Sequence, residues 1–166
     1  MTMLAEPVGV ESAWPERLRA VGLRVTPRRV ALLEALDAHP HALVDELHAA
    51  AAGAVDHLTK QSVYISLNDF VVHGLVRRIE PPGSAARYET RTADNHHHLV
   101  CEGCGAIADV DCAVGAAPCL TPADDAGFVV HTADVTYLGL CSKCQSAQRM
   151  AADNSTNPTT NPHPEN

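Results

Sequence analysis

The pattern of apolar and polar positions along the first 90 residues predicts four helices followed by a β-hairpin. The expected helices cover residues 15–23, 27–39, 43–53 and 60–73. Thr26 and Thr59 stand directly before two of them and are typical N-cap residues. Pro27 suits a first helical position, and Gly74 suits the position after a helix end. Residues 75–90 then give two short β-prone runs around a Pro-Pro-Gly turn.

The fourth expected helix combines a buried stripe with a polar face. The stripe consists of Val63, Leu67, Phe70 and Val71, which recur at helical spacing. The residues left facing outward are Lys60, Gln61, Tyr64 and Ser66. Such side chains can reach base edges in a major groove, and the hairpin arginines Arg77, Arg78 and Arg87 would then lie along phosphates. The order of elements favours a winged helix-turn-helix; the alternative is an ordinary bundle with a solvated polar face.

After residue 95 the pattern changes to short β-prone runs, which predict a small three-stranded antiparallel sheet. The fold class is therefore α+β: a winged helix-turn-helix followed by a small α/β domain. The expected divisions are residues 13–90, 91–150 and 151–166. The last of these is rich in Asn and Pro without periodicity, and it is predicted to be a disordered tail.

Charge and composition narrow the class of protein. The net charge of −8 argues against a protein that coats nucleic acid through bulk charge. Residues 16–29 nevertheless hold five arginines and one glutamate, so a local basic face is expected. The chain shows no signal-peptide pattern and no apolar run near the roughly 20 residues of a membrane span. We therefore expect a cytoplasmic protein with reduced thiols and no membrane partner.

The cysteines predict a zinc site. Two C-x-x-C pairs, each beside a β-prone run, supply Cys101, Cys104, Cys141 and Cys144. Four thiolates in two such pairs suit a closed tetrahedral Zn²⁺ site, whose binding energy would stabilise a sheet with a thin core. A redox dithiol and free buried thiols are the alternatives. Cys112 and Cys119 have no C-x-x-C partner and are expected to be small apolar residues, with an auxiliary redox role left open.

Three consecutive histidines directly precede the first cysteine pair. In a strand, His96 and His98 point to one face, and Cys101 points to the other. This alternation predicts two separate sites. Candidate further ligands for the histidine pair are His41, Glu89 and Asp109. Nitrogen and oxygen donors favour Fe²⁺, Mn²⁺, Zn²⁺ or Ni²⁺ over thiophilic metals; the alternative is a histidine cluster without function.

Several stretches together resemble the ferric uptake regulator family. They are GLRVTPRRVALLEAL, HPHALVDEL, KQSVYISLNDFVVHGLVRRI, NHHHLVCEGCGAIADVD and YLGLCSKC, and the resemblance as a whole runs from about residue 15 to 145. The run NHHHLVCEGCGAIADVDCAVGAAPCLT looks like the actinobacterial branch whose genes accompany catalase-peroxidase genes, a peroxide-responsive branch.

The resemblance implies a homodimeric, metal-dependent repressor of an inverted-repeat operator in double-stranded DNA. It assigns structural zinc to the four C-x-x-C cysteines and a regulatory metal to His41, Glu89, His96, His98 and Asp109. It also implies DNA contacts from Tyr64 and from Arg28 or Arg29, beside those expected of Lys60, Gln61, Ser62, Arg77 and Arg78. A further family site would use His97, but the late position near Ala133 is not a histidine, so His131 or Asp134 would have to substitute.

The resulting hypothesis is a repressor that holds regulatory Fe²⁺, with Mn²⁺ or Zn²⁺ possible, and that responds to peroxide at catalase or other oxidative-stress genes. Asp109 supports it, because an aspartate there accompanies peroxide sensors in the resembled family. Glu89 is of the iron-sensor kind, so an iron-status repressor is the alternative. A zinc enzyme is a third class, but its candidate general base, Glu102, sits inside the C-x-x-C turn. We therefore expect no enzyme activity.

Overall fold

The computed structural model of the 166-residue chain describes residues 12–92, 94, 96–111, 124, 126–131 and 133–155. The chain divides into two compact units, Met1–Asp94 and Asn95–Asn166. This division lies four residues after the expected boundary, which follows residue 90. Cys112 and Cys119 lie outside the described residues.

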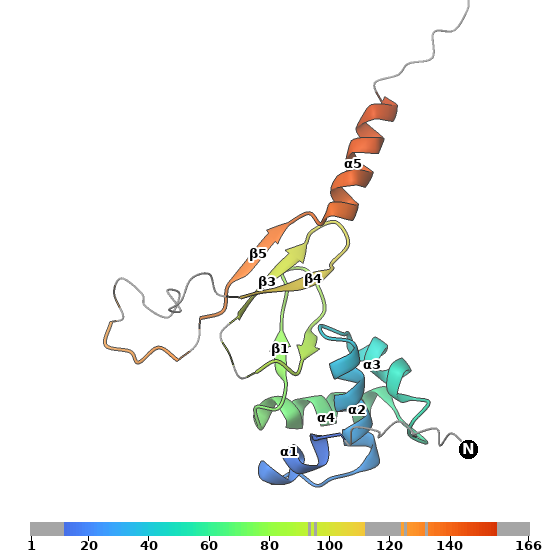
Figure 1. Ribbon diagram of the computed structural model, residues 1–166, viewed down its shortest axis with the longest axis vertical. Helices are drawn as coiled ribbons and strands as arrows, with labels where there is room; N and C mark the ends of the chain where they lie inside the picture. The colour runs from blue at the N-terminus through green and yellow to red at the C-terminus, as the bar shows by residue number, and fades with distance from the viewer. Residues whose placement is uncertain are drawn as a thin grey trace, which may run out of the picture. The chain divides into compact units, whose positions relative to one another are not determined.

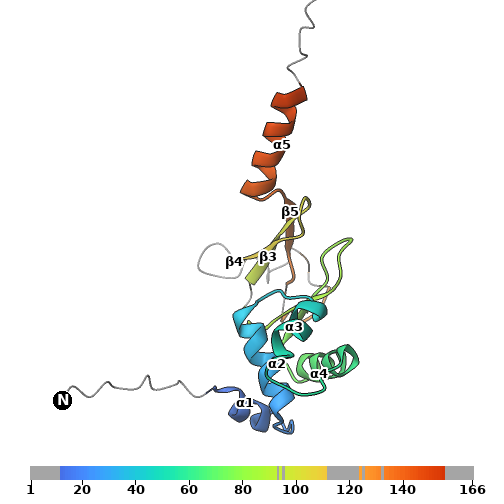
Figure 2. The ribbon, with the colours of Figure 1, turned by 90° about the vertical axis from the view of Figure 1, so that its right-hand side faces the viewer.

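The first unit contains the predicted four helices and hairpin (Figures 1 and 2). Its elements are α1 (Trp14–Ala20), α2 (Pro27–Ala38), α3 (Val44–Ala51), α4 (Lys60–Val72), β1 (Arg77–Ile79) and β2 (Arg87–Glu89). The two strands pair antiparallel, with Arg77 opposite Glu89 and Ile79 opposite Arg87. This is the expected winged helix-turn-helix.

The predicted caps explain where two helices begin. The hydroxyl of Thr26 accepts a hydrogen bond from the Arg29 N–H at 3.3 Å, which satisfies a free donor at the start of α2. Thr59 and Ser62 make a reciprocal pair at the start of α4, each hydroxyl accepting from the other backbone N–H at 3.2 Å. Gly74 follows α4 with a φ of 68°, a left-handed conformation that glycine adopts without steric cost.

The core of the first unit lies where α2, α3 and α4 meet. Its fully buried side chains include Leu32, Leu33, Leu36, Leu47, Val63, Leu67 and Phe70. Each such side chain stabilises the fold by roughly 1.5–3 kcal/mol relative to exposure. The prediction that Ser66 faces outward is wrong: it is 4% exposed and donates to the Ser62 carbonyl at 2.9 Å. Position 66 is four residues before Phe70 and therefore belongs to the buried stripe.

The second unit contains β3 (His96–Cys101), β4 (Ile107–Asp111), β5 (Thr136–Gly139) and α5 (Ser142–Ser155). The strand order is β4-β3-β5. The α+β class and the three-stranded sheet are confirmed, but the sheet is mixed rather than antiparallel. β4 runs antiparallel to β3, whereas β5 runs parallel to it. The reason is that β5 starts at the end of the sheet where β4 stops, on the other side of β3.

The helix α5 begins directly after Cys141, contains Cys144 and was not predicted. It continues to Ser155, five residues into the segment expected to be a tail. Its described side chains are mostly exposed, so the periodic apolar stripe that signals a helix is weak. Among the described residues, no helix is both long and apolar enough to span a membrane.

Candidate metal centres and nucleic-acid interface

The parallel pairing of β5 with β3 brings the two cysteine pairs together. Cys101, the last residue of β3, is aligned with Gly139, two residues before Cys141. Four sulfur atoms all lie within 4.8 Å of one another, those of Cys101, Cys104, Cys141 and Cys144. None of the four forms a disulfide. Four thiols at this spacing, in the turn after β3 and at the start of α5, fit a closed structural zinc site.

Within the cysteine cluster, the thiol of Cys101 loses its proton most readily. Backbone hydrogen bonds, above all from the Cys141 N–H at 3.3 Å, lower the pKa of Cys101 to about 6. The hydrogen bond of Cys144 to the Cys101 sulfur raises the pKa of Cys144 to about 12. One thiolate is therefore favoured and further negative charge is resisted, so a divalent cation is needed to hold four thiolates together.

Gly103 lets the turn after β3 approach the second cysteine pair. A Cβ at this position would lie 3.0 Å from the Cys144 sulfur, 3.1 Å from the Cys144 Cβ and 3.2 Å from Cδ2 of Leu140. A side chain would therefore displace Cys144, which makes glycine a requirement of this cysteine cluster.

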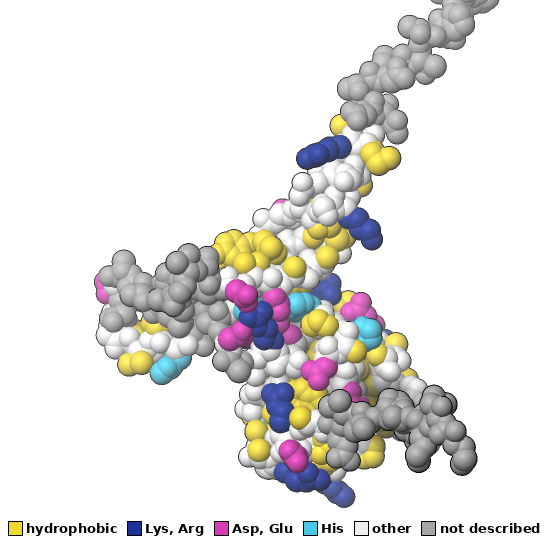
Figure 3. Space-filling view, viewed as in Figure 1, with side chains coloured by type: hydrophobic (Ala, Val, Ile, Leu, Met, Phe, Trp, Pro, Cys, Tyr) yellow, Lys and Arg dark blue, Asp and Glu magenta, His cyan; other side chains and the backbone are white. Residues whose placement is uncertain are grey.

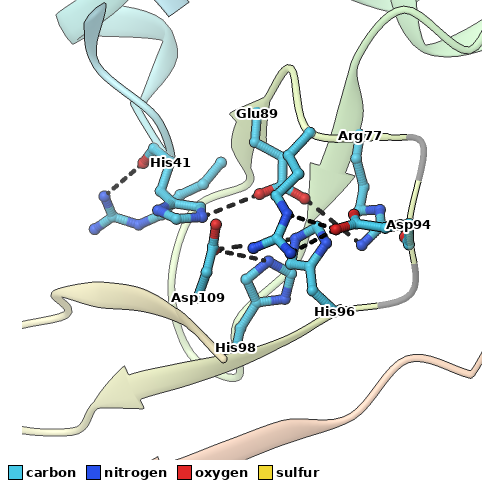
Figure 4. A network of polar contacts seen from close by, with 9 residues as sticks. His41, Arg77, Glu89, Asp94, His96, His98 and Asp109 are labelled. Carbon is cyan, nitrogen blue, oxygen red and sulfur yellow. Dashed lines mark hydrogen bonds and ion pairs between the residues drawn. The ribbon is translucent and has the colours of Figure 1, made fainter. Parts of the chain in front are cut away.

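The first half of β3 carries the histidines, and its pairing with β4 supplies a carboxylate. His98 is directly opposite Asp109 in the antiparallel register. The Asp109 Oδ1 lies 3.7 Å from His98 Nε2 and 4.0 Å from His96 Nε2. Figure 4 shows how these three side chains lie. The two rings are 5.0 Å apart, and both histidines are buried. The second unit therefore presents two imidazoles and one carboxylate as a three-donor set.

His97 points to the other face of β3 and is also buried. Its ring meets Tyr137 of β5 edge-on, with centroids 6.3 Å apart. Within the described part of the chain, its Nδ1 has no hydrogen-bond partner, and it belongs to no cluster of metal-ligating side chains that includes His131 or Asp134. The described residues therefore offer this histidine an aromatic neighbour and no metal site.

The first unit presents a second, smaller donor set. His41 Nε2 and Glu89 Oε2 are 3.0 Å apart, and the Glu89 carboxylate is 1% exposed (Figure 4). Arg77, predicted to lie along phosphates, instead directs Nη1 toward Glu89 Oε1 at 3.7 Å and donates from Nη2 to the Asp94 carbonyl at 3.1 Å. His41 follows α2 and Glu89 ends β2, so this set joins the bundle to the hairpin.

The exposed face of α4 is the candidate surface for DNA bases. Lys60, Gln61 and Tyr64 are exposed, as predicted. Ile65 and Asn68 share this exposure and were missed; Asn68 follows Tyr64 by four residues and could have been found from that spacing. Ser62 was predicted to contact DNA, but its hydroxyl is engaged in the cap of α4, where it also donates to the Thr59 carbonyl at 2.7 Å.

The arginines near the start of α2 have different roles. Arg29 donates to the Arg24 carbonyl at 2.9 Å and is paired with Asp69, so it ties α2 to α4. Arg24 and Arg28 are exposed and line a cleft of about 390 Å³ between these helices. In the hairpin, Arg78 is exposed and paired with Glu80. Of the two predicted alternatives at α2, Arg28 is therefore the arginine better placed for a phosphate.

Comparison with known proteins agrees with this arrangement. The family model described as the ferric uptake regulator family matches residues 20–137. The chain is 53% identical over 131 residues to the transcriptional regulator FurA of Mycobacterium tuberculosis, covering 79% of this chain and 89% of that protein. It is 31% identical over 134 residues to the peroxide-responsive repressor PerR of Staphylococcus aureus, covering 77% of this chain and 86% of that protein.

A solved structure shows the same fold. The ferric uptake regulator Fur of Helicobacter pylori superposes with a TM-score of 0.61 at 19% identity, covering 87% of this chain and 97% of that one. The matched residues include most of both units, and the winged helix-turn-helix and the four zinc-type cysteines are present in the described structure. The chain therefore belongs to the ferric uptake regulator family and is a metal-dependent transcriptional regulator.

Proposed function

We propose that this chain is a homodimeric repressor that binds an inverted-repeat operator in double-stranded DNA while Fe²⁺ occupies a regulatory site, and that it releases the operator when peroxide oxidises that site. The observation that carries the proposal is the three-donor set of β3 and β4. Asp109 lies opposite His98 and beside His96, which supplies the nitrogen and oxygen donors that suit Fe²⁺ and that Mn²⁺ or Zn²⁺ also accept.

The regulatory site would combine this set with the donors of the first unit. Three donors leave an Fe²⁺ ion under-coordinated, and the pair His41 and Glu89 supplies two more. Sequence resemblance to the family supports the same five residues. A metal held by both sets would fix the winged helix relative to the second unit and thereby favour the arrangement that fits DNA.

The second unit also has the surface that a homodimer requires. Leu99 and Tyr137 are paired in register on β3 and β5 and are each about half exposed, and Figure 3 shows apolar side chains gathered over β5. An uncovered apolar patch on a sheet marks an interaction surface, and a second copy of this chain is the proposed occupant. Two copies present two winged helices, which matches an operator with two half-sites. The proposed location of this dimer is the cytoplasm.

Peroxide sensing would act on the ligand histidines. Bound Fe²⁺ supplies the redox chemistry that activates peroxide. One peroxide oxygen replaces a ring hydrogen of His41 or His96 as hydroxyl, and the other leaves with that hydrogen as water. An oxidised ring is a poorer ligand, so the metal and then the operator are lost. Catalase and other oxidative-stress genes are the proposed targets.

An iron-status repressor is the second candidate. Glu89, buried and 3.0 Å from His41, is the observation that favours it, because this carboxylate is of the iron-sensor kind in the family. The chain's similarity to the FurA protein is also greater than its similarity to the PerR protein. In this case iron loss, rather than peroxide, would release the operator.

One experiment separates the two candidates. Protein loaded with Fe²⁺ without oxygen is bound to operator DNA, peroxide is added at constant iron, and release is followed by gel shift. We expect release and a gain of one oxygen on His41 or His96 by mass spectrometry, with protein loaded with Mn²⁺ as the unreactive control. An operator complex that survives peroxide would favour the iron-status repressor. Oxidised cysteines together with zinc release would instead indicate sensing at the zinc site.

A further inference from the structure

Three consecutive residues of β2 contact the short segment that carries His41. Arg87 Nη1 donates to the His41 carbonyl at 3.1 Å. The Tyr88 N–H donates to the Ala42 carbonyl at 3.2 Å and makes an antiparallel bridge with that residue. The Glu89 carboxylate lies 3.0 Å from the His41 ring. The hairpin therefore holds both the backbone and the side chain of the histidine.

The backbone of His41 needs such support. Its φ of 61° lies in the left-handed region, which is sterically unfavourable for a non-glycine residue. A residue keeps this conformation when its surroundings enforce it. The charge-assisted hydrogen bond from Arg87 to its carbonyl is one such constraint, because a bond from an ionised donor is about twice as strong as a neutral one.

Strand geometry explains why Arg87 and Glu89 act on the same residue. They are two positions apart on β2 and point to one face, whereas Tyr88 between them packs into the core. One face of β2 thus offers His41 a guanidinium for its carbonyl and a carboxylate for its ring.

We propose that Arg87 is a positioning residue for the regulatory metal: it holds His41 in the left-handed conformation that turns the imidazole toward Glu89. This inference rests on the proposed role of His41 and Glu89 as regulatory ligands. It replaces the prediction from sequence that Arg87 lies along a DNA phosphate. The hairpin then transmits ligand geometry, because a shift of β2 moves the carbonyl contact, the bridge and the carboxylate together.

The test compares Arg87→Ala with Arg87→Lys and Arg78→Ala. The probe is Co²⁺, whose visible absorption reports the geometry of the regulatory site, titrated into protein that retains its zinc. We expect Arg87→Ala to bind Co²⁺ about 10- to 100-fold more weakly, as for other residues that orient metal ligands. Its absorption spectrum should change, while the zinc content stays that of the wild type. Arg87→Lys keeps a cationic donor and should recover most of the affinity.

Arg78→Ala is the matched control, since this arginine belongs to the same hairpin but is paired with Glu80 on the exposed side. It should keep the wild-type Co²⁺ affinity and reduce the salt dependence of operator binding by about one unit of slope. Arg87→Ala, at saturating metal, should keep the wild-type slope. Unchanged Co²⁺ affinity in Arg87→Ala, or a reduced slope at saturating metal, would overturn the proposal in favour of a phosphate contact.

Failure of the underlying site would look different. His41→Ala is measured alongside and should weaken Co²⁺ binding strongly. If His41→Ala binds Co²⁺ like the wild type, the regulatory site itself is misassigned. If His41→Ala weakens binding and Arg87→Ala does not, only the role of Arg87 is refuted.

Discussion

At the scale of single residues, the cluster of four cysteines depends on the absence of a Cβ atom at Gly103. Gly103 sits where a Cβ would come within 3.0 Å of the Cys144 sulfur. Gly53, by contrast, has open space at the corresponding position. The same added methyl group should therefore disturb the cysteine cluster at Gly103 and leave it unaffected at Gly53.

We expect Gly103→Ala to weaken the zinc site and to cost about 1–3 kcal/mol, as overpacking does elsewhere. Zinc transfer to a colorimetric chelator should be faster than in the wild type. Gly53→Ala should leave that rate unchanged. Equal transfer rates for all three proteins would show that the turn adjusts without moving Cys144.

The cysteine pKa values predict how the zinc-free protein responds to pH. The pKa of Cys101 is lowered from 9.0 to about 6, so its stabilising contribution is complete above pH 9 and is lost as pH falls through about 6. The pKa of Cys144 is raised from 9.0 to about 12, so it destabilises the fold progressively above pH 9. Stability should therefore rise between about pH 6 and 9 and fall beyond.

The measurement is the melting temperature of zinc-free protein from pH 5 to 10, taken as the difference between the wild type and Cys101→Ser. That difference removes the contribution of titratable groups outside the cysteine cluster. If the difference in melting temperature does not grow between pH 6 and 9, the lowered pKa of Cys101 is contradicted.

Several residue assignments followed from sequence, and several could not. Strand alternation separated His96 and His98 from the cysteines, because the period of a strand is fixed at two. The orientation of Arg77 and Arg87 was not accessible in the same way. A basic hairpin suggests phosphates, but Glu89 and the His41 carbonyl lie within reach only after folding.

At the scale of elements, α4 is defined by its cap as much as by its buried stripe. Thr59 and Ser62 satisfy each other's backbone N–H groups at its first turn. We expect Thr59→Ala to lower the free energy of unfolding by about 1 kcal/mol. Thr59→Ser keeps the hydroxyl and is the control. Urea denaturation of the zinc-loaded protein measures both, and equal midpoints for the two variants would rule out a contribution of the cap.

Element boundaries in the first unit were predictable because caps, prolines and glycines mark them locally. The direction of β5 and the existence of α5 were not. The direction of a third strand depends on the path of the connection, residues 112–135, rather than on its own sequence. The apolar signal of α5 is weak because most of its described side chains are exposed.

At the scale of the whole molecule, the proposed function couples two binding equilibria. If metal raises operator affinity by a given factor, operator DNA must raise metal affinity by the same factor. We expect a factor of about 5 to 150. Titration of Mn²⁺ into the protein, with and without operator duplex, should give the same ratio as operator binding with and without Mn²⁺. If the Mn²⁺ affinity is the same with and without operator DNA, this coupling is excluded.

The register of β3 and β4 has a consequence for comparing related sequences. Residues 102–106 connect the two strands and include the zinc-type ligand Cys104, while the resulting register sets Asp109 against His98. Losing a single residue from this connection would turn Asp109 to the opposite face of the sheet. A homologue could then retain all five ligand residues in its sequence and still fail to bind the regulatory metal. The length of this loop is therefore as informative as the ligand residues about whether a homologue keeps the metal-sensing function.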